Sequence, residues 1–169
     1  MNIHSVGLAC LLLVQPVTAQ IQGELLLGTP AQSQNVSIQH LDGRLSWEWL
    51  EMSPLPCRLD TSGRLGVLDV NNENALRAGG EAIVACQLSP RWQMELPLGM
   101  IWLSDYQFGQ TGQRKDYGGP WQFVAALGLS YAISAEWSLG YEFSHMSNWN
   151  LYDSNPTLNS HNLLIAYHF

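Results

Sequence analysis

The sequence predicts an all-β protein, an eight-stranded antiparallel transmembrane β-barrel of the bacterial outer membrane. Three observations lead to this fold class. Charged residues make up 12% of the 169 residues, about half of the roughly 25% found in soluble globular domains. No stretch approaches the ~18 consecutive apolar residues that a membrane helix needs. Apolar residues instead alternate with small or polar ones, as in a barrel whose strands face lipid on one side only.

The N-terminus has the features of a secretory signal peptide. Val6–Val14 is an apolar core, Pro16 interrupts it, and Val17–Ala19 supplies small residues before a cleavage site. Cleavage there would divide the chain into a signal peptide, 1–19, and an outer-membrane barrel, 20–169. No Lys or Arg precedes the apolar core, so a buried N-terminal strand or helix is the alternative.

Eight strands are expected from the alternation and from the turn residues between the alternating segments. Their ranges are Gln20–Thr29, Val36–Leu50, Gly63–Val70, Glu81–Leu88, Met94–Leu103, Trp121–Ile133, Glu136–Ser147 and Asn159–Phe169. Trp121–Ile133 shows the pattern best, with its large apolar residues at odd positions. Small residues on the other face suit the crowded interior of a narrow barrel, so the large face is expected to meet lipid. A soluble barrel with an apolar cavity is an alternative that periodicity alone leaves open.

The connections between strands are expected to be long outside the cell and short in the periplasm. The long ones are Ser104–Pro120, Asn71–Gly80 and Asn148–Leu158, and the short ones are Ser89–Trp92 and Ser134–Ala135. The Glu51–Ser62 connection is too long for this rule. Trp102, Trp121 and Trp137 fall near strand ends, where membrane barrels carry aromatic girdles. The last four residues, Ala166–Phe169, resemble the outer-membrane assembly signal.

Polar residues on the inward faces are expected to form a network inside the barrel. They are Glu24, Arg44, Glu48, Glu95 and Glu142. A barrel of eight strands has no open channel, so the interior is not expected to be a functional lumen. The net charge of −7, with only seven basic residues, argues against a nucleic-acid partner. Cys57 and Cys86 lack metal-ligand spacing, so no metal site is indicated, and whether they form a disulfide is left open.

The outward stripe of Glu136–Ser147 continues beyond its apolar residues into His145 and Ser147. Two residues along a strand lie about 6.6 Å apart and point the same way, so their side chains can approach each other. An imidazole beside a hydroxyl is the pairing of a general base with a nucleophile. The alternative is that these polar residues mark where the strand leaves the hydrocarbon, and the short H-x-S pattern alone favours that interpretation.

The segment His145–Asn148, followed by Asn155 and Asn159, resembles the C-terminal signature of the outer-membrane lipid A 3-O-deacylases. The resemblance extends without gaps as far as Ser160. It covers the rest of the mature chain more loosely, including Leu45–Trp49 and Thr61–Leu65. The resemblance implies a serine esterase that acts on lipid A in the outer leaflet.

Residue by residue, the resemblance implies that Ser147 is the nucleophile, His145 the general base and Asn155 the oxyanion-site residue. The family's catalytic acid falls on Asn159, which is a departure from the family pattern. An Asn carbonyl can accept the imidazole proton, but it cannot supply the negative charge that stabilises imidazolium. Asp153 and His161 are nearby polar residues whose participation is less favoured than an ordinary loop or strand role.

A second departure lies in the loop after Ser147. The family tends to have a glycine there, whereas this chain has Trp149 and Asn150. This departure puts a backbone oxyanion donor from the loop in doubt. Trp149 is expected either to contact acyl chains or to anchor the loop.

Three functions follow from these residues. The first is a lipid A 3-O-deacylase-like serine esterase that needs no cofactor. Its partners would be lipid A or lipopolysaccharide and other outer-membrane lipids, and a homodimer is left open. The second is a catalytically silent structural or surface-interaction barrel, which Asn159 favours. The third is a soluble barrel that binds an apolar ligand, which extraction without detergent would reveal. The sequence does not predict which acyl chains an esterase of this kind would prefer.

Overall fold

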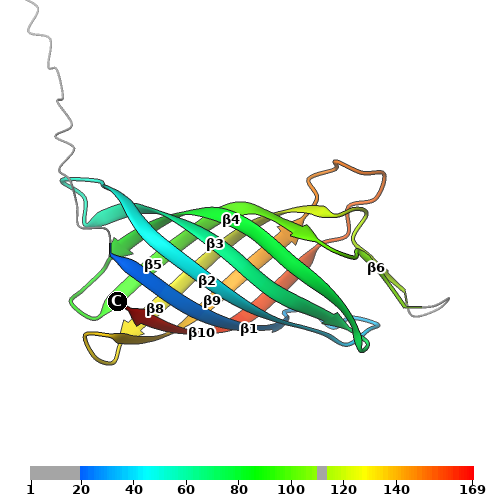
Figure 1. Ribbon diagram of the computed structural model, residues 1–169, viewed down its shortest axis with the longest axis horizontal. Helices are drawn as coiled ribbons and strands as arrows, with labels where there is room; N and C mark the ends of the chain where they lie inside the picture. Colours follow the sequence, from blue (N-terminus) through cyan, green and yellow to red (C-terminus); the bar gives the residue numbers. More distant parts are fainter. Residues whose placement is uncertain (1–19, 110–113) are drawn as a thin grey trace, which may run out of the picture.

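The computed structural model describes residues 20–109 and 114–169, and its main sheet is a closed antiparallel barrel (Figure 1). The barrel strands are β1 Ile21–Pro30, β2 Ile38–Glu51, β3 Cys57–Val70, β4 Glu73–Gln87, β5 Trp92–Leu103, β8 Trp121–Ala132, β9 Trp137–Ser147 and β10 Leu158–His168. Their order around the barrel is β1-β10-β9-β8-β5-β4-β3-β2. The predicted eight-stranded barrel is confirmed. The predicted signal peptide lies outside the described residues.

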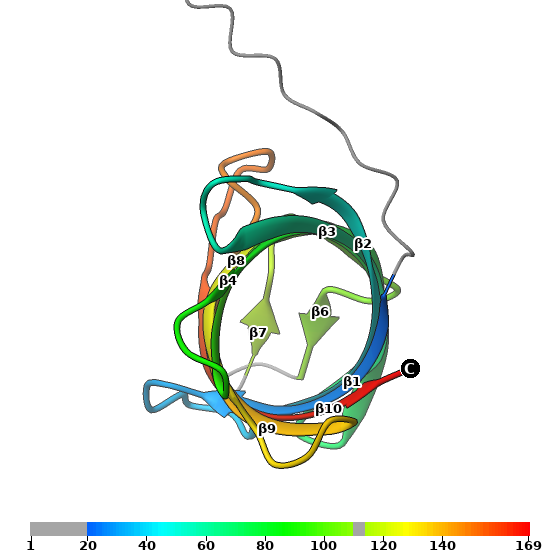
Figure 2. The same cartoon turned by 90° about the vertical axis from the view of Figure 1, so that its left-hand side faces the viewer.

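A small hairpin, β6 Gln107–Phe108 and β7 Lys115–Asp116, lies in the connection between β5 and β8. Seen from the end that carries the chain termini, the hairpin lies within the outline of the barrel (Figure 2). No helix in the described ranges is long and apolar enough to cross a membrane.

The two faces of each strand have opposite character. On β9 the large residues Trp137, Leu139 and Tyr141 are exposed, whereas Ser138 and Glu142 are buried. On this strand, small and polar residues therefore face the interior up to the apolar cluster at its outer end, and large apolar residues cover the outside. This pattern is the one that a lipid-facing barrel produces, and it confirms the predicted assignment of faces.

Two strands, β3 and β4, begin earlier than predicted. Because β4 begins at Glu73, the expected Asn71–Gly80 loop is wrong. β3 and β4 are joined by Asn71 and Asn72 alone, whose φ angles of 52° and 67° match a type I′ hairpin turn. Gly79 interrupts the alternation of side chains because the backbone of β5 leaves no room for a side chain at this position. A Cβ there would lie 2.1 Å from the Met100 carbonyl oxygen and 2.8 Å from Ile101.

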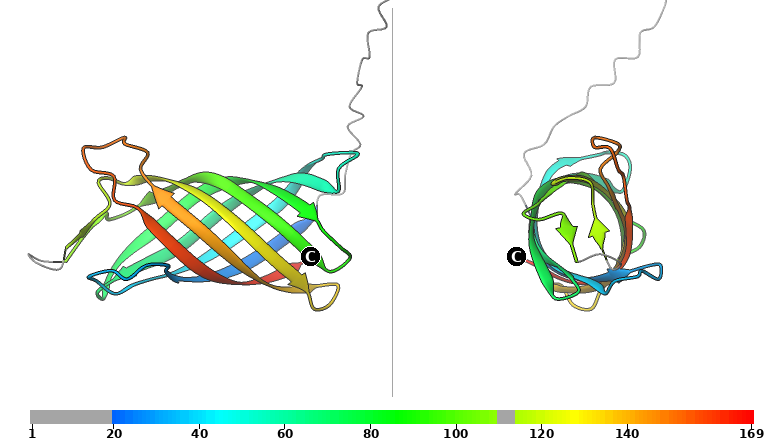
Figure 3. Two further views of the ribbon diagram at one scale, coloured as in Figure 1. Left: turned by 180° about the vertical axis from the view of Figure 1, so that it is seen from behind. Right: turned by 90° about the vertical axis from the view of Figure 1, so that its right-hand side faces the viewer.

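The connections distinguish the two ends of the barrel. β1 begins and β10 ends at the end that carries the short connections 52–56, 88–91 and 133–136, which we call the periplasmic end (Figures 1 and 3). Because β3 starts at Cys57, most of the Glu51–Ser62 segment is strand, and it obeys the short-connection rule. The longer connections 31–37, 104–120 and 148–157 lie at the opposite end, which we call the outer end, together with the two-residue turn 71–72, which departs from the rule.

Aromatic side chains mark both ends. Trp102 and Trp121 are paired neighbours on β5 and β8 at the outer end, and both are exposed. At the periplasmic end, Trp137 packs against Tyr167, which in turn packs against Phe169, each pair with ring centroids 4.9 Å apart. The positions fit the predicted aromatic girdles.

A network of buried charges fills the periplasmic half of the interior. Arg44 lies at its centre and contacts four carboxylates, those of Glu24, Glu81, Glu95 and Glu142. Its Nη1 lies 2.9 Å from Glu142 Oε2, and its Nη2 lies 3.1 Å from Glu95 Oε2. The predicted network is confirmed for Glu24, Arg44, Glu95 and Glu142, and it also includes Glu81, which was not predicted. Glu48 is only half-buried and makes no ion pair within the described ranges.

An apolar cluster fills the interior at the outer end. It comprises Val36, Ile38, Leu68, Val70, Ala75, Ile101, Leu103, Phe108, Tyr117, Val124, Met146 and Leu158. Phe108 and Tyr117 come from the β6–β7 hairpin and the residue after it, and their rings pack edge to face at 6.2 Å. The hairpin is therefore packed into the barrel mouth, and it supports from inside the ends of β9 and β10.

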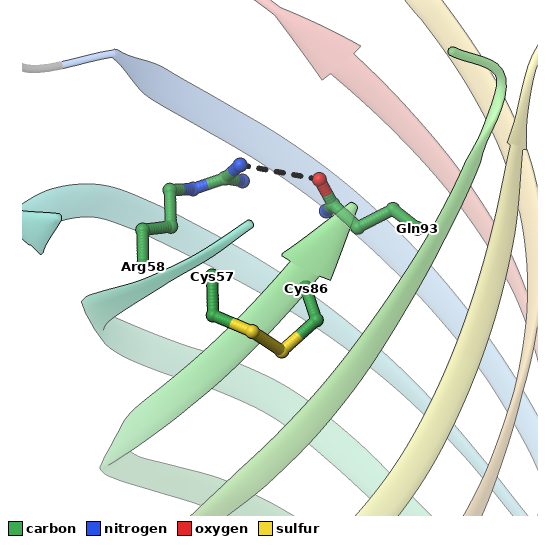
Figure 4. The surroundings of a disulfide bond; sticks show 4 residues. All are labelled: Cys57, Arg58, Cys86 and Gln93. Carbon is green, nitrogen blue, oxygen red and sulfur yellow. Dashed lines mark hydrogen bonds between the residues drawn. A yellow bond between two sulfur atoms is a disulfide. The ribbon is translucent and has the colours of Figure 1, made fainter. Parts of the chain in front are cut away.

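A disulfide joins Cys57 and Cys86, opposite residues of β3 and β4 at the periplasmic end (Figure 4). Beside it, Arg58 Nη1 donates a hydrogen bond of 3.2 Å to Gln93 Oε1, which links β3 to β5 (Figure 4). The disulfide question that the sequence left open is thus answered. The oxidising periplasm allows such a bond.

Removing the disulfide is expected to lower the free energy of unfolding. The bond closes a loop with a sequence separation of 29, for which chain entropy gives about 3.5 kcal/mol. The double variant Cys57→Ser/Cys86→Ser should therefore unfold at lower urea concentration in detergent, followed by tryptophan fluorescence. Reduced wild type is the matched control and should unfold with the double variant. An unchanged midpoint in both samples would contradict a stabilising bond.

Candidate active site

His145 and Ser147 lie at the outer end of β9, on its lipid-facing side. Both side chains are half-buried, whereas their neighbours Ser144 and Met146 face the interior and are buried. Antiparallel pairing with β10 places Asn159 directly opposite His145. The strand register alone therefore brings Asn159 beside His145 on the same outer surface.

A hydrogen bond of 2.7 Å joins His145 Nδ1 to Asn159 Oδ1. With the amide oxygen as acceptor, Nδ1 carries the imidazole proton, and Nε2 has a free lone pair. This contact fixes both the tautomer and the orientation of the ring, as the acid of a catalytic triad does. Within the described ranges, Ser147 makes no hydrogen bond to His145; such contacts often tighten only when substrate binds.

Asn155 lies in the loop 148–157 that joins β9 to β10. Its Oδ1 accepts a hydrogen bond of 2.9 Å from the backbone N–H of Asn148, the residue after Ser147. The N–H of Asn148 is therefore already occupied, and it is not available as an oxyanion donor. The side-chain NH₂ of Asn155, in contrast, is held by this contact and remains able to donate.

The chain turns sharply after the candidate nucleophile. Trp149 and Asn150 have φ angles of 51° and 60°, and Leu151 N–H donates to the Asn148 carbonyl at 3.0 Å, a type I′ arrangement. A bulky residue in this conformation is strained by about 1–3 kcal/mol. The departure from glycine therefore does not prevent the turn, because the surrounding contacts impose it.

The side chain of Asn148 anchors this turn inside the barrel mouth. It is fully buried, and its Nδ2 donates to the carbonyls of Tyr117 at 3.1 Å and Ser154 at 2.6 Å. The neighbouring Gly118 has a φ of 82°, and a Cβ there would lie 2.2 Å from the Ser154 carbonyl oxygen. The β9–β10 loop is thus fastened to the connection before β8.

Apolar side chains surround the polar pair on the outer surface. Phe123 of β8 is the partner of Ser147, and Trp149 packs edge to face on its ring at 5.3 Å. The small Ala125 is the partner of His145. Trp149 is 73% exposed, so a lipid chain that reaches Ser147 would meet its indole.

The two less favoured candidates lie apart from the pair. His161 is opposite Phe143, and its Nδ1 bonds to the Tyr141 hydroxyl rather than to Asn159. Asp153 is exposed in the β9–β10 loop. In the described ranges, neither residue forms a hydrogen bond to His145, whereas Asn159 does.

The sequence did not predict two contacts that hold the site, the hydrogen bond from Asn148 to Tyr117 and the packing of Phe123 on Trp149. Asn148 belongs to the motif, and its parity indicates an inward side chain, but its partner Tyr117 lies 31 residues away. No local pattern predicts that contact. The packing of Phe123 on Trp149 could have been inferred from strand register, had the register of β8 and β9 been derived.

Comparisons with known proteins bear on the family and the fold of the chain. A family model described as lipid A 3-O-deacylase (PagL) matches residues 42–168. The outer membrane enzyme PagL is a similar solved structure, with a TM-score of 0.68 and 17% identity over 86% of this chain and 97% of that chain. A comparison with curated proteins gives no match.

Other solved barrels resemble the fold alone. The N-terminal barrel domain of Pseudomonas aeruginosa OprF has a TM-score of 0.62 at 10% identity, over 89% of this chain and 97% of that chain. Yersinia pestis Ail has a TM-score of 0.54 at 8% identity, over 89% and 99%. None of these findings supports a homodimer. Because the family model covers three quarters of its length, and because the fold is that of outer-membrane barrels, the chain belongs to the lipid A 3-O-deacylase (PagL) family.

Proposed function

We propose that this protein is a serine esterase that hydrolyses the 3-linked hydroxyacyl ester of lipid A in the outer leaflet. The observation that carries the proposal is the hydrogen bond between His145 and Asn159, which orients an imidazole on the lipid-facing surface beside Ser147. Lipid A carries its ester groups at the depth where strands leave the outer leaflet. The substrate therefore reaches the pair from the side, within the membrane.

In the first half of the reaction, Ser147 Oγ attacks the ester carbonyl carbon while His145 Nε2 takes the hydroxyl proton. The carbonyl oxygen becomes an oxyanion, to which the Asn155 side-chain NH₂ donates. The tetrahedral intermediate then collapses. The carbon–oxygen bond to the sugar breaks, and His145 returns the proton to the leaving sugar oxygen, which leaves the acyl group on Ser147.

In the second half, a water molecule attacks the acyl-serine ester. His145 Nε2 takes a proton from this water, and the same Asn155 amide stabilises the second oxyanion. Collapse releases the hydroxy fatty acid and restores the Ser147 hydroxyl with the proton from His145. The net reaction consumes one water and needs no cofactor.

The apolar surface around the pair suits an acyl chain. Phe123 and Trp149 lie beside Ser147, and Phe143 lies below His145 along β9. A chain that extends from the attacked carbonyl towards the membrane centre would run over these side chains. Because the chain is already in hydrocarbon, this contact acts through van der Waals packing and guides the chain, without a gain from removal of apolar surface from water.

Replacing Asn159 with an acid is expected to raise deacylase activity on the order of tenfold or more, because a carboxylate stabilises the imidazolium that an amide only orients. In a serine protease, the opposite change lowers turnover by about 10⁴. Asn159→Glu restores the family's residue, and Asn159→Asp keeps the shape that already bonds His145. The measurement is the rate of hydroxy fatty acid release from lipid A in mixed micelles.

Asn159→Leu is the matched control, because it keeps the size but removes the acceptor, and its rate should fall below that of wild type. A measurable wild-type rate supports the proposed function. Equal rates in wild type and in both acidic variants would show that position 159 does not act as the acid. No release by any of these proteins would favour the second function, a catalytically silent barrel, for which the neutral Asn159 is the supporting observation.

A further inference from the structure

The basic residues are distributed unevenly over the molecule. All seven lie in the described ranges. Five of them are buried in the interior or lie at the periplasmic end, namely Arg44, Arg58, Arg64, Arg77 and Arg91. The other two, Arg114 and Lys115, lie next to each other on the β6–β7 hairpin at the outer end. The outer end thus has two cations to offer an anionic ligand.

These two cations differ in their partners. Arg114 is exposed and pairs with Asp116, with Nη2 3.3 Å from Oδ2. Lys115 Nζ contacts only neutral groups, the Gln34 Oε1 at 3.3 Å, the Thr157 carbonyl at 3.5 Å and the face of the Tyr117 ring at 5.1 Å. It makes no ion pair in the described ranges, and residues 110–113 contain no carboxyl group.

A half-buried ammonium without a carboxylate is an unusual arrangement. Burial lowers the pKa of Lys115, because the charged form loses hydration. Neutral oxygens and a ring face recover only part of that loss. An anionic ligand at Nζ would recover more, since hydrogen bonds between ions are roughly twice as strong as neutral ones.

The ammonium lies close to the candidate active site. It bridges the connections 31–37, 104–120 and 148–157 through its contacts with Gln34 and Thr157. Thr157 precedes Asn159 by two residues, a separation of about 6.6 Å along a strand. Lys115 Nζ therefore lies on the order of 10 Å from the His145–Asn159 pair, on the side that faces out of the membrane.

We propose that Lys115 binds a phosphate group on the sugar headgroup of the glycolipid substrate. The proposal rests on the proposed function, which places a 3-linked ester of lipid A at Ser147. Lipid A is a phosphorylated glucosamine disaccharide, so a phosphate on the same or the neighbouring sugar lies one ring away from that ester. Lys115 would then fix how far the headgroup sits above the surface, and it would select phosphorylated lipid.

The kinetic test compares two substrates in mixed micelles, bisphosphorylated lipid A and the same lipid after removal of its phosphates. Lys115→Met keeps the apolar stem and removes the charge. Its kcat/KM on the phosphorylated lipid is expected to fall about tenfold, with little change on the dephosphorylated lipid. Arg114→Met, which removes a cation already paired with Asp116, is the matched control and should change either rate less than twofold. Equal losses on both lipids in Lys115→Met would overturn the proposal.

A binding test keeps the proposal separate from catalysis. Ser147→Ala protein, with and without Lys115→Met, is titrated with the two lipids in detergent micelles, and tryptophan fluorescence reports binding. Phosphorylated lipid should bind about tenfold tighter than dephosphorylated lipid only when Lys115 is present. If wild type releases no fatty acid but this difference appears, the proposed function fails and the phosphate site stands. No difference overturns the phosphate site, and so does equal binding of inorganic phosphate alone, which would point to a site for the free anion.

Discussion

Replacing Ser147 with alanine is expected to lower deacylase turnover by at least about 10³-fold, because it removes the proposed nucleophile. His145→Ala should have a similar effect, since it removes the proposed general base. Residues that act as a unit are not additive, so the double variant should be no slower than either single variant. The first measurement is the rate at which the purified proteins release hydroxy fatty acid. The second is mass spectrometry of lipid A from cells that express them.

Folding provides the control for this experiment. Ser147 and His145 face outward and lie outside the interior packing, so both variants should keep the heat-modifiable mobility of a folded barrel. Ser144→Ala is a matched variant, because it removes a hydroxyl from the same strand but from its inward face; it should retain near wild-type turnover. A Ser147→Ala protein that keeps most of the activity would exclude Ser147 as the nucleophile.

Removing the charge of Arg44 is expected to lower the free energy of unfolding by about 3–5 kcal/mol. The guanidinium is fully buried and contacts four carboxylates, which Arg44→Met would leave close together without their cation. Nearby Arg64 still contacts Glu81 and Glu142, so part of the network remains neutralised. Urea unfolding in detergent, followed by tryptophan fluorescence, measures the change.

Arg58→Met is the control for the interior network. Arg58 lies at the periplasmic end, where its side chain is 23% exposed and pairs with Asp60. Partly exposed ion pairs contribute about 1 kcal/mol or less, so this variant should lose much less stability than Arg44→Met. Similar losses in the two variants would show that burial of the Arg44 network does not matter for stability.

The sequence predicted the parts of this molecule that repeat along strands. The outward parity of Trp137 continues through His145 and Ser147, and antiparallel pairing then brings Asn159 to His145. Both follow from the two-residue period of a strand. The contact between Asn159 and His145 was therefore predictable, whereas the roles of these residues in catalysis stay proposals.

The sequence did not predict the parts that depend on contacts between distant segments. The start of β4 was missed because Arg77 and Gly79 interrupt the apolar pattern. The structure explains both, since Arg77 pairs with Asp42 and the backbone of β5 leaves no room beside Gly79. The anchoring of Asn148 by Tyr117 was missed for the same reason, because it depends on how a hairpin fills the barrel mouth.

The filled barrel mouth has a consequence for the cell that carries this protein. Phe108 and Tyr117 are almost wholly shielded from solvent within the apolar cluster, and the Arg44 network occupies the space beneath them. In the part of the chain that the structure describes, apolar side chains thus close the outer end of the interior above the buried charges. We therefore expect the barrel to add no pore to the outer membrane that contains it, as is usual for barrels of eight strands.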